Sequence, residues 1–351
     1  MATNGDFMTT DTVFDSTTDP YYSYDYGDEM CDKTRVMQFG TIFIPVFFSI
    51  MVIFSLFGNI LVIVILAKYE NLKSLTNAFI LNLAVSDLFF TVGLPFWAYY
   101  HMYGWTLGEP ACKIVNFVFF VGFYSSGILL IMMTAHRYVA VMNPLSDIVT
   151  TTGISSVLVS VIIWAASILI ASPAFIFTKV KDNNQCVYAD SNWSLWGIYQ
   201  QNILFIVSSV LFSFCYSQII CRLLRPTAQR KNKTLKLIFT LMVVFFVGWT
   251  PYNFVIFLKS FYLWNNQPVD SHNLVAVCEP YKQLEYAYDV SRIFAFSHCC
   301  LNPVLYVFVG VKFKNHLKKI LKSLGGNKSS IRNRQSRLTI TSVTSGEEFS
   351  L

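Results

Sequence analysis

The chain contains seven mostly apolar stretches, each long enough to form a helix across a lipid bilayer. The hydrocarbon layer is about 30 Å thick, so a helix rising about 1.5 Å per residue needs roughly 20 apolar residues to cross it. These stretches lack the alternating pattern of membrane β-strands. The predicted spans are about 37–67, 76–103, 111–142, 154–178, 195–224, 235–263 and 281–309.

The composition supports a membrane protein. Hydrophobic residues make up 54% of the chain and charged residues only 13%, whereas soluble domains carry about 25% charged residues. A soluble protein of 351 residues could not hide this much apolar surface. We therefore predict an all-α membrane protein, a seven-transmembrane helix bundle with a short amphipathic eighth helix.

Four regions follow from the same pattern. Residues 1–35 are polar and acidic and are expected to form a disordered extracellular arm without a cleavable signal peptide, and residues 36–311 form the seven-helix domain. Residues 312–324 place apolar side chains at helical spacing between lysines, which predicts a helix on the cytoplasmic membrane surface. Residues 325–351 are expected to form a disordered tail rich in Ser and Thr.

The distribution of basic residues predicts the orientation. Of the 26 Lys and Arg residues, 18 lie at the three loops of one side or in the C-terminal tail. Because positively charged loops stay in the cytoplasm, we expect an extracellular N-terminus and a cytoplasmic C-terminus. Four cysteines, Cys31, Cys112, Cys186 and Cys278, then lie toward the outside, where disulfides persist and three pairings are possible.

Asp87 lies deep in the second predicted span. An ionised side chain at the centre of a bilayer costs about 2.5–3.5 kcal/mol on insertion scales, so Asp87 should face the bundle interior. Asn59, Ser126 and Asn302 lie at comparable depth and could surround it. We expect a hydrated or cation-holding switch; the alternative is a hydrogen-bonded buried group without a switching role.

Prolines interrupt several predicted helices, because proline removes a backbone hydrogen bond and bends the helix. Trp249 lies close to Pro251 in "GWTPYNF", and Asn302 and Tyr306 share a face beside Pro303 in "LNPVLY". A single kink is often only a packing feature. Together these kinks indicate that the kinked helices move relative to the rest of the bundle.

The stretch "MMTAHRYVAVMNP" ends the third predicted span with a basic pair. A helix from Cys112 to Arg137 is roughly 37 Å long at about 1.5 Å per residue, so its two ends should emerge on opposite faces of the membrane. Arg137, flanked by His136 and Tyr138, is therefore expected at the cytoplasmic mouth, available to a partner. The alternative is an arginine that only extends into the interface.

The motifs "GNILVIVIL", "LNLAVSDL", "HRYVAV", "GWTPY" and "NPVLY", with Trp164, occur in an order that resembles the rhodopsin-like G-protein-coupled receptors over about residues 40–320. The stretches "LPFWAYY" and "FSHCCLNPVLYVFVGVKFKNHL" narrow the resemblance to chemokine receptors. Within that family the chain is most similar to receptors for lymphotactin, a C-class chemokine, through "LTNAFILNLAVSDLFF", "QLEYAY", Arg292 and His136.

The resemblance implies Cys112–Cys186 and Cys31–Cys278 disulfides. It also implies a G-protein contact at Arg137, an activation switch at Trp249, and a Tyr306 that moves with it. The chain departs from the family at two informative positions. His136 stands where most members have Asp, and Arg292 stands where chemokine receptors commonly have Glu.

The outer face is acidic, which favours a basic protein ligand. The acidic segment "DPYYSYDYGDE" embeds tyrosines in a context typical of sulfation, although it could be only a solvated tail. We predict that this arm captures a basic, lymphotactin-like chemokine, whose N-terminus enters a pocket between the helices. Asn192 heads a glycosylation sequon. The predicted ligand contacts are Tyr21, Tyr22, Tyr24, Tyr26, Trp97, Tyr99, Phe119, Glu285 and Arg292.

The expected cytoplasmic partners are an inhibitory-class heterotrimeric G protein and arrestin, the latter recruited by tail phosphorylation. Enzyme motifs, metal-spaced clusters and transporter-type repeats are absent from the sequence, so we predict no catalysis, cofactor, metal or nucleic-acid partner. The remaining alternative is a decoy receptor that binds chemokine without activating a G protein. The predicted phosphorylation sites are Ser336, Thr339, Thr341, Ser342, Thr344 and Ser345.

Overall fold

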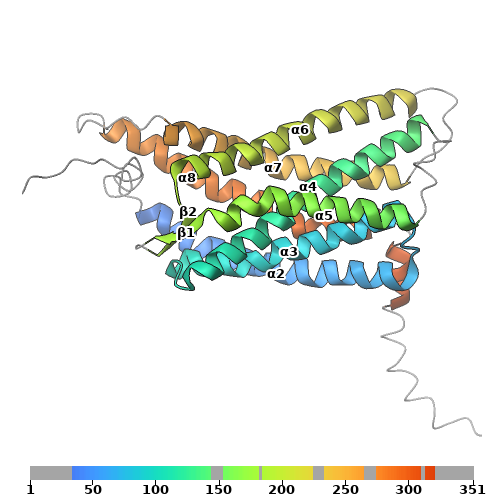
Figure 1. Ribbon diagram of the computed structural model, residues 1–351, viewed down its shortest axis with the longest axis horizontal. Coiled ribbons are helices and arrows are strands. Elements are labelled where there is room, and N and C mark those ends of the chain that lie inside the picture. Colours follow the sequence, from blue (N-terminus) through green and yellow to red (C-terminus); the bar gives the residue numbers. More distant parts are fainter. Residues whose placement is uncertain are drawn as a thin grey trace, which may run out of the picture.

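The computed structural model describes residues 34–143, 153–181, 184–223, 233–264, 274–309 and 313–320. Long helices lie side by side along the longest axis of the molecule (Figure 1). They are α2 (Thr34–Tyr69), α3 (Leu75–Tyr103), α4 (Gly108–Met142), α5 (Gly153–Ile176), α6 (Ser191–Leu223), α7 (Lys233–Trp264), α8 (Leu274–Phe296) and α9 (His298–Val309).

Six of the described helices, α2 to α7, are long and apolar enough to cross a membrane. The seventh predicted span is divided between α8 and α9, which meet at Ser297. The Ser297 N–H donates to the Ile293 carbonyl at 3.1 Å, and the Cys300 N–H donates to the Ser297 carbonyl at 3.2 Å. The predicted bundle is therefore confirmed, with a seventh crossing that is segmented and carries charged residues.

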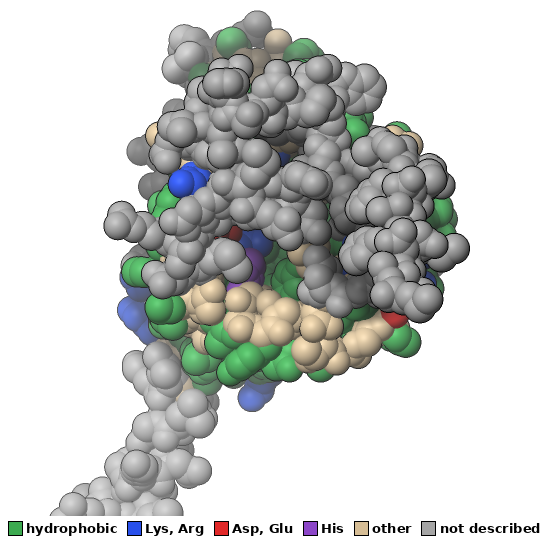
Figure 2. Space-filling model, turned by 90° about the vertical axis from the view of Figure 1, so that its left-hand side faces the viewer, with side chains coloured by type: hydrophobic (Ala, Val, Ile, Leu, Met, Phe, Trp, Pro, Cys, Tyr) green, Lys and Arg blue, Asp and Glu red, His purple; other side chains and the backbone are tan. Residues whose placement is uncertain are grey.

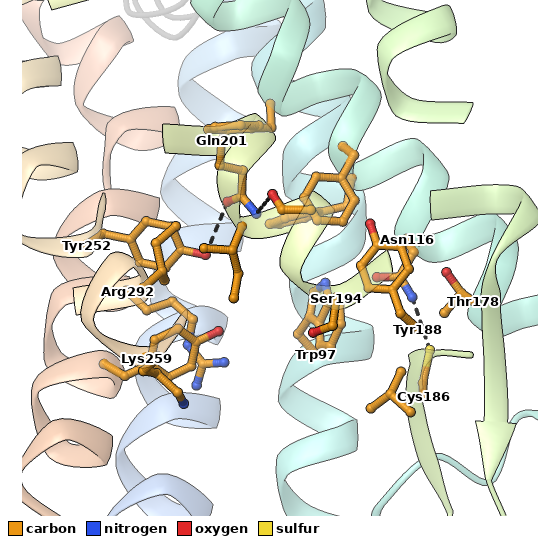
Figure 3. Close-up of a pocket in the computed structure, with 18 of the residues that line it drawn as sticks. Trp97, Asn116, Thr178, Cys186, Tyr188, Ser194, Gln201, Tyr252, Lys259 and Arg292 are labelled. Atoms are coloured by element: carbon orange, nitrogen blue, oxygen red, sulfur yellow. Dashed lines mark hydrogen bonds between the residues drawn. The ribbon is translucent and has the colours of Figure 1, made fainter. Parts of the chain in front are cut away.

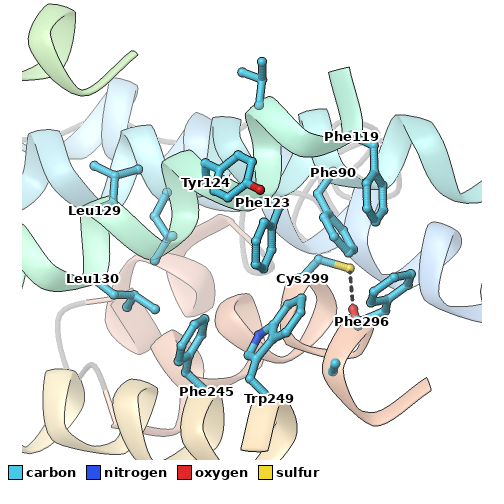
Figure 4. Packing of buried hydrophobic residues seen from close by; sticks show 14 of the residues in the cluster. Phe90, Phe119, Phe123, Tyr124, Leu129, Leu130, Phe245, Trp249, Phe296 and Cys299 are labelled. Atoms are coloured by element: carbon cyan, nitrogen blue, oxygen red, sulfur yellow. Dashed lines mark hydrogen bonds between the residues drawn. The ribbon is translucent and has the colours of Figure 1, made fainter. Parts of the chain in front are cut away.

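The apolar side chains divide between the bundle interior and its outer surface. Phe90, Phe123, Trp249 and Phe296 belong to one buried cluster (Figure 4). Numerous large apolar side chains on α2, α5 and α6 are instead exposed on the outside of the bundle. That arrangement suits a protein whose outer surface contacts lipid rather than water.

A glycine brings α3 and α4 into close contact. A Cβ atom at Gly122 would lie 2.4 Å from the Phe90 backbone nitrogen and 2.9 Å from the Ser86 carbonyl oxygen. Real side chains do not approach backbone atoms this closely, so only glycine permits this spacing. The close contact aligns Ser86 with Ser125 and Ser126, and their hydroxyls are hydrogen-bonded to one another across the interface.

A two-stranded antiparallel sheet, which the sequence analysis did not predict, lies at one end of the bundle (Figure 1). Strands β1 (Thr178–Lys181) and β2 (Gln185–Tyr188) pair so that Val180 is opposite Cys186. A disulfide joins Cys186 to Cys112 at the start of α4. This pairing agrees with the one that the family resemblance implied.

A short helix over residues 313–320 lies at the opposite end (Figure 1). His316 Nε2 is 3.1 Å from Glu70 Oε1, and its ring stacks on Tyr69 with centroids 5.0 Å apart. These contacts attach the helix to the end of α2. The remainder of the predicted 312–324 helix lies outside the described residues.

Candidate functional site

A cavity of about 340 Å³ lies within the bundle, near the end that carries the sheet. Its lining comes from α3, α4, α6, α7 and α8, and from both strands of the sheet. Viewed from that end, basic, acidic and histidine side chains are visible inside a hollow (Figure 2). In the close-up, Arg292, Lys259 and Tyr252 lie on one side, and Trp97, Asn116 and Tyr188 lie on the other (Figure 3).

Arg292 on α8 is the most buried cation of the cavity, with 7% of its surface exposed. Its Nη2 atom lies 2.8 Å from Asp289 Oδ1 and 2.8 Å from His101 Nε2. A guanidinium group only donates hydrogen bonds, so the His101 nitrogen is the acceptor in this contact. Among the described residues, no acceptor lies within hydrogen-bonding distance of Arg292 Nε.

A second cation, Lys259 on α7, lies beside Arg292. Its Nζ is 2.7 Å from Glu285 Oε1 on α8 and 4.2 Å from the centre of the Tyr288 ring. The guanidinium carbon of Arg292 lies 5.0 Å from the centre of the same ring. Tyr288 therefore contacts both cations, as expected for cation–π pairs.

The other wall is positioned by the disulfide. Asn116 on α4 donates from Nδ2 to the Cys186 sulfur at 3.0 Å, and so fixes β2 over the cavity. Tyr188 of β2 lines the cavity, and burial raises the pKa of its hydroxyl to about 12. The hydroxyl therefore remains protonated at physiological pH and can donate a hydrogen bond.

Aromatic rings form the deepest part of the cavity. Trp249 is 1% exposed, and its ring lies 4.8 Å from Phe123 and 5.2 Å from His298 between centroids. Trp97 on α3 lies further from the deepest part and contacts Phe119 edge to face, with ring centroids 6.1 Å apart. Any molecule that enters deeply would therefore contact the residue that the sequence predicts to be a switch.

Asp87 on α3 lies further from the cavity than Trp249 and is fully buried against α4 and α9. Its carboxylate accepts hydrogen bonds from Asn302 Nδ2 at 2.8 Å and from Ser126 Oγ at 3.2 Å. Asn59 instead donates to the Ser55 and Cys299 carbonyls, at 3.0 Å and 2.9 Å. The structure thus brings together the polar residues that the sequence placed at one depth, although Asn59 contacts the helix backbone rather than the carboxylate.

The predicted kinks lie next to this polar cluster. Pro251 is within α7 and Pro303 is within α9. A Cβ atom at Gly58 would lie 2.8 Å from Pro303 Cβ, which shows that α2 and α9 pack closely at the kink. The Tyr306 ring is buried one turn further and lies 6.1 Å from the Phe313 ring.

At the far end of α4, Arg137 donates from Nη2 to Thr76 Oγ1 on α3 at 2.9 Å. The His136 ring meets the edge of Phe79 at 6.2 Å, and Tyr138 lies 5.9 Å from Phe214 on α6. Arg137 is thus held by a neutral hydroxyl, and its Nε atom has no hydrogen-bond partner among the described residues. This end is opposite the cavity.

Two predicted pocket residues do not line the cavity. The hydroxyls of Tyr99 and Thr106 are hydrogen-bonded at 2.8 Å, and the Tyr99 ring packs on Tyr103. These contacts lie near the C-terminal end of α3. Glu285 is not among the lining residues but forms an ion pair with Lys259, which is. Asn192 is exposed in the first turn of α6. Outside the described residues lie the Cys31 partner of the second predicted disulfide and the residues Tyr21, Tyr22, Tyr24, Tyr26, Ser336, Thr339, Thr341, Ser342, Thr344 and Ser345.

The sequence analysis did not select Lys259, which lines the cavity, or His101, which contacts Arg292. Both have ionisable side chains within long, mostly apolar helices, where such residues are candidates for a function. That rule would have identified them. Within the described residues, no group of three or more His, Cys, Asp and Glu side chains could hold a metal ion.

The family model for the 7 transmembrane receptor (rhodopsin family) matches residues 58–306. The chain belongs to the chemokine receptors of this family. It is 43% identical to Chemokine XC receptor 1 of Homo sapiens over 302 residues, which cover 86% of this chain and 88% of the relative. It is 37% identical to CX3C chemokine receptor 1 of Rattus norvegicus over 305 residues, which cover 85% and 84% of the two chains.

A third relative, C-C chemokine receptor type 3 of Cavia porcellus, is 36% identical over 331 residues, or 92% of this chain and 89% of that protein. A chemokine receptor of this family is a multi-pass membrane receptor rather than an enzyme. The cavity and Arg137 therefore lie at opposite ends of a receptor bundle.

Proposed function

We propose that this chemokine receptor binds a basic chemokine of the lymphotactin class and activates an inhibitory-class heterotrimeric G protein, giving calcium flux and chemotaxis. The observation that carries the proposal is the arrangement along α4. One end of α4 borders the ligand-sized cavity, and the other presents Arg137 beside Thr76. Likeness to Chemokine XC receptor 1 supports the lymphotactin class.

The orientation is part of the proposal. We place the receptor in the plasma membrane, with the N-terminus outside and the C-terminus in the cytoplasm, because most basic residues lie on the side of the C-terminal tail. Different tags on the two ends, stained in intact cells, test this. Only the N-terminal tag should stain. Staining of the C-terminal tag would contradict this orientation.

Chemokine capture is proposed to use two contacts. The acidic arm binds the basic body of the chemokine, and the chemokine N-terminus enters the cavity at Trp97, Phe119 and Arg292, near Tyr99 and Glu285. Replacing Tyr21, Tyr22, Tyr24 and Tyr26 with Phe removes any sulfates but keeps the rings. The affinity for lymphotactin should fall. Unchanged affinity would show that the arm does not contribute to binding.

The cytoplasmic end is proposed to act on the G protein through Arg137, with His136 and Tyr138 beside it. Movement of α7 about Pro251 and of Tyr306 would open this end, and the Asp87 cluster would couple it to the cavity. Phosphorylated Ser and Thr residues of the tail would then recruit arrestin.

A decoy receptor is the second candidate, because His136 leaves Arg137 without a neighbouring carboxylate. Cells expressing the receptor separate the two candidates. Lymphotactin should lower cAMP, and pertussis toxin should abolish this effect. Binding and internalisation of lymphotactin without a cAMP response would establish the decoy instead.

A further inference from the structure

The cavity lining contains buried hydrogen-bond donors without acceptors. Three such atoms occur among the described lining residues: Trp97 Nε1, Trp249 Nε1 and Arg292 Nε. Buried donors in folded proteins are normally paired, and exceptions often mark a position that a ligand occupies. A ligand oxygen that reached Arg292 would give its Nε an acceptor.

The charges of the lining favour an anion in particular. The charged side chains among the described lining residues are Lys259, Arg292 and Asp190. Asp190 is exposed at the end of β2, whereas the two cations lie deeper against Tyr288. The planar guanidinium group of Arg292 also matches the geometry of a carboxylate better than an ammonium group does.

The acids beside these cations do not offset this preference. Asp289 is 2.8 Å from Arg292 Nη2, and Glu285 is 2.7 Å from Lys259 Nζ. Each carboxylate is therefore already bound to a cation and is poorly available to a ligand amine. Arg292 Nε, in contrast, has no hydrogen-bond partner among the described residues, so it can donate to a ligand oxygen that reaches it without loss of either pair.

We infer that the cavity of this receptor recognises an acidic side chain, Asp or Glu, in the N-terminal segment of its chemokine, through Arg292 with Lys259 beside it. This inference rests on the proposed function. The site thus selects chemokines with an acidic rather than a purely cationic N-terminal segment.

The test uses recombinant human lymphotactin in two forms: the natural one, and one in which every Asp and Glu ahead of the first cysteine becomes Asn or Gln. Calcium flux is measured on the unchanged receptor and on Arg292→Gln. A second variant, Asp289→Asn with Arg292→Gln, removes both partners and so avoids an unpaired buried carboxylate. Surface staining corrects for expression.

On the unchanged receptor, the amide form should be about tenfold less potent than the natural form, the factor expected for one charged hydrogen bond. Arg292→Gln should weaken the natural form by a similar factor and the amide form hardly at all. Arg292→Lys should restore part of the difference. The control Lys113→Gln removes a cation from an exposed ion pair with Glu109 and should leave the difference between the two forms intact.

Two results would overturn the inference. One is equal potency of both lymphotactin forms on the unchanged receptor. The other is an equal loss for both forms on Arg292→Gln and on the paired variant, since that pattern indicates a purely structural role for Arg292.

If neither form activates the unchanged receptor, the lymphotactin assignment in the proposed function fails. The anion site is then tested directly on purified full-length receptor with glutarate, against chloride at equal ionic strength. Glutarate should raise the Tm of the unchanged receptor but not that of the paired variant. The same shift in both, or no shift in either, would contradict an anion site at Arg292.

Discussion

At the residue scale, the position beside Arg137 affects how firmly this arginine is held at its end of the bundle. Arg137 donates to the neutral hydroxyl of Thr76 at 2.9 Å, and His136 packs against Phe79. A hydrogen bond to a neutral acceptor is weaker than one to a carboxylate. We therefore expect this receptor to show raised signalling without ligand.

His136→Asp should reduce that basal signalling. A carboxylate next to Arg137 adds a charge-assisted interaction of about 1.5 kcal/mol, or roughly tenfold in the population of the active state. Basal cAMP suppression in cells is the measurement. His136→Asn is the control, because it has similar polarity without the charge. Identical basal activity in all three receptors would contradict the argument.

Gly122→Ala should destabilise the bundle by about 1–3 kcal/mol, because its Cβ would overlap backbone atoms that cannot rotate away. The nearest such atom is the Phe90 nitrogen at 2.4 Å. Thermal unfolding of the purified receptor checks this. Gly127→Ala is the matched control on α4, since its Cβ would meet only the flexible end of Leu204 at 3.3 Å. Equal Tm values for the two variants would refute the close α3–α4 contact.

At the scale of elements, the long helices and the short helix over 313–320 were predictable from the sequence, and the two-stranded sheet was not. Runs of roughly 20 apolar residues have one stable form in a bilayer, because a helix satisfies its own backbone hydrogen bonds. The hairpin consists of strands of four residues each, β1 and β2. Its position depends on a disulfide and on Asn116, contacts made by residues distant in sequence.

In the candidate site, too, some contacts could be predicted from the sequence and others could not. Asp87, Ser126 and Asn302 could be grouped from the sequence because they lie at one depth and polar side chains at that depth turn toward the bundle interior. The pairing of Lys259 with Glu285 depends on how α7 and α8 are rotated against each other. Periodicity in a single sequence does not determine that rotation.

The disulfide should govern both the stability and the cavity wall. Cys112 and Cys186 are separated by 74 residues, so their bond constrains a long loop. Changing both to Ser should cost about 2–5 kcal/mol of stability and release β2 from above the cavity. Thermal unfolding and lymphotactin binding measure the two effects. Cys221→Ser, at an exposed free cysteine, is the control. A double variant with unaltered Tm and binding would show that the hairpin is held by other contacts.

At the scale of the whole molecule, a mainly apolar interior with one polar cluster around Asp87 joins two ends that each hold a partly or fully buried cation. The cavity end contains Arg292 and Lys259, and the opposite end contains Arg137. Trp249 lies between the cavity and the Asp87 cluster, within a bundle whose other buried residues are mainly apolar. This arrangement provides a physical route by which occupation of the cavity can bias the end that contains Arg137.

Nucleotide exchange in a reconstituted system tests this route most directly. The receptor is purified in lipid nanodiscs with an inhibitory-class heterotrimeric G protein, and GTP uptake is measured with and without lymphotactin. The account predicts that lymphotactin accelerates exchange several-fold and that Arg137→Ala abolishes the acceleration. Lymphotactin that binds the nanodiscs while the exchange rate stays unchanged would contradict it.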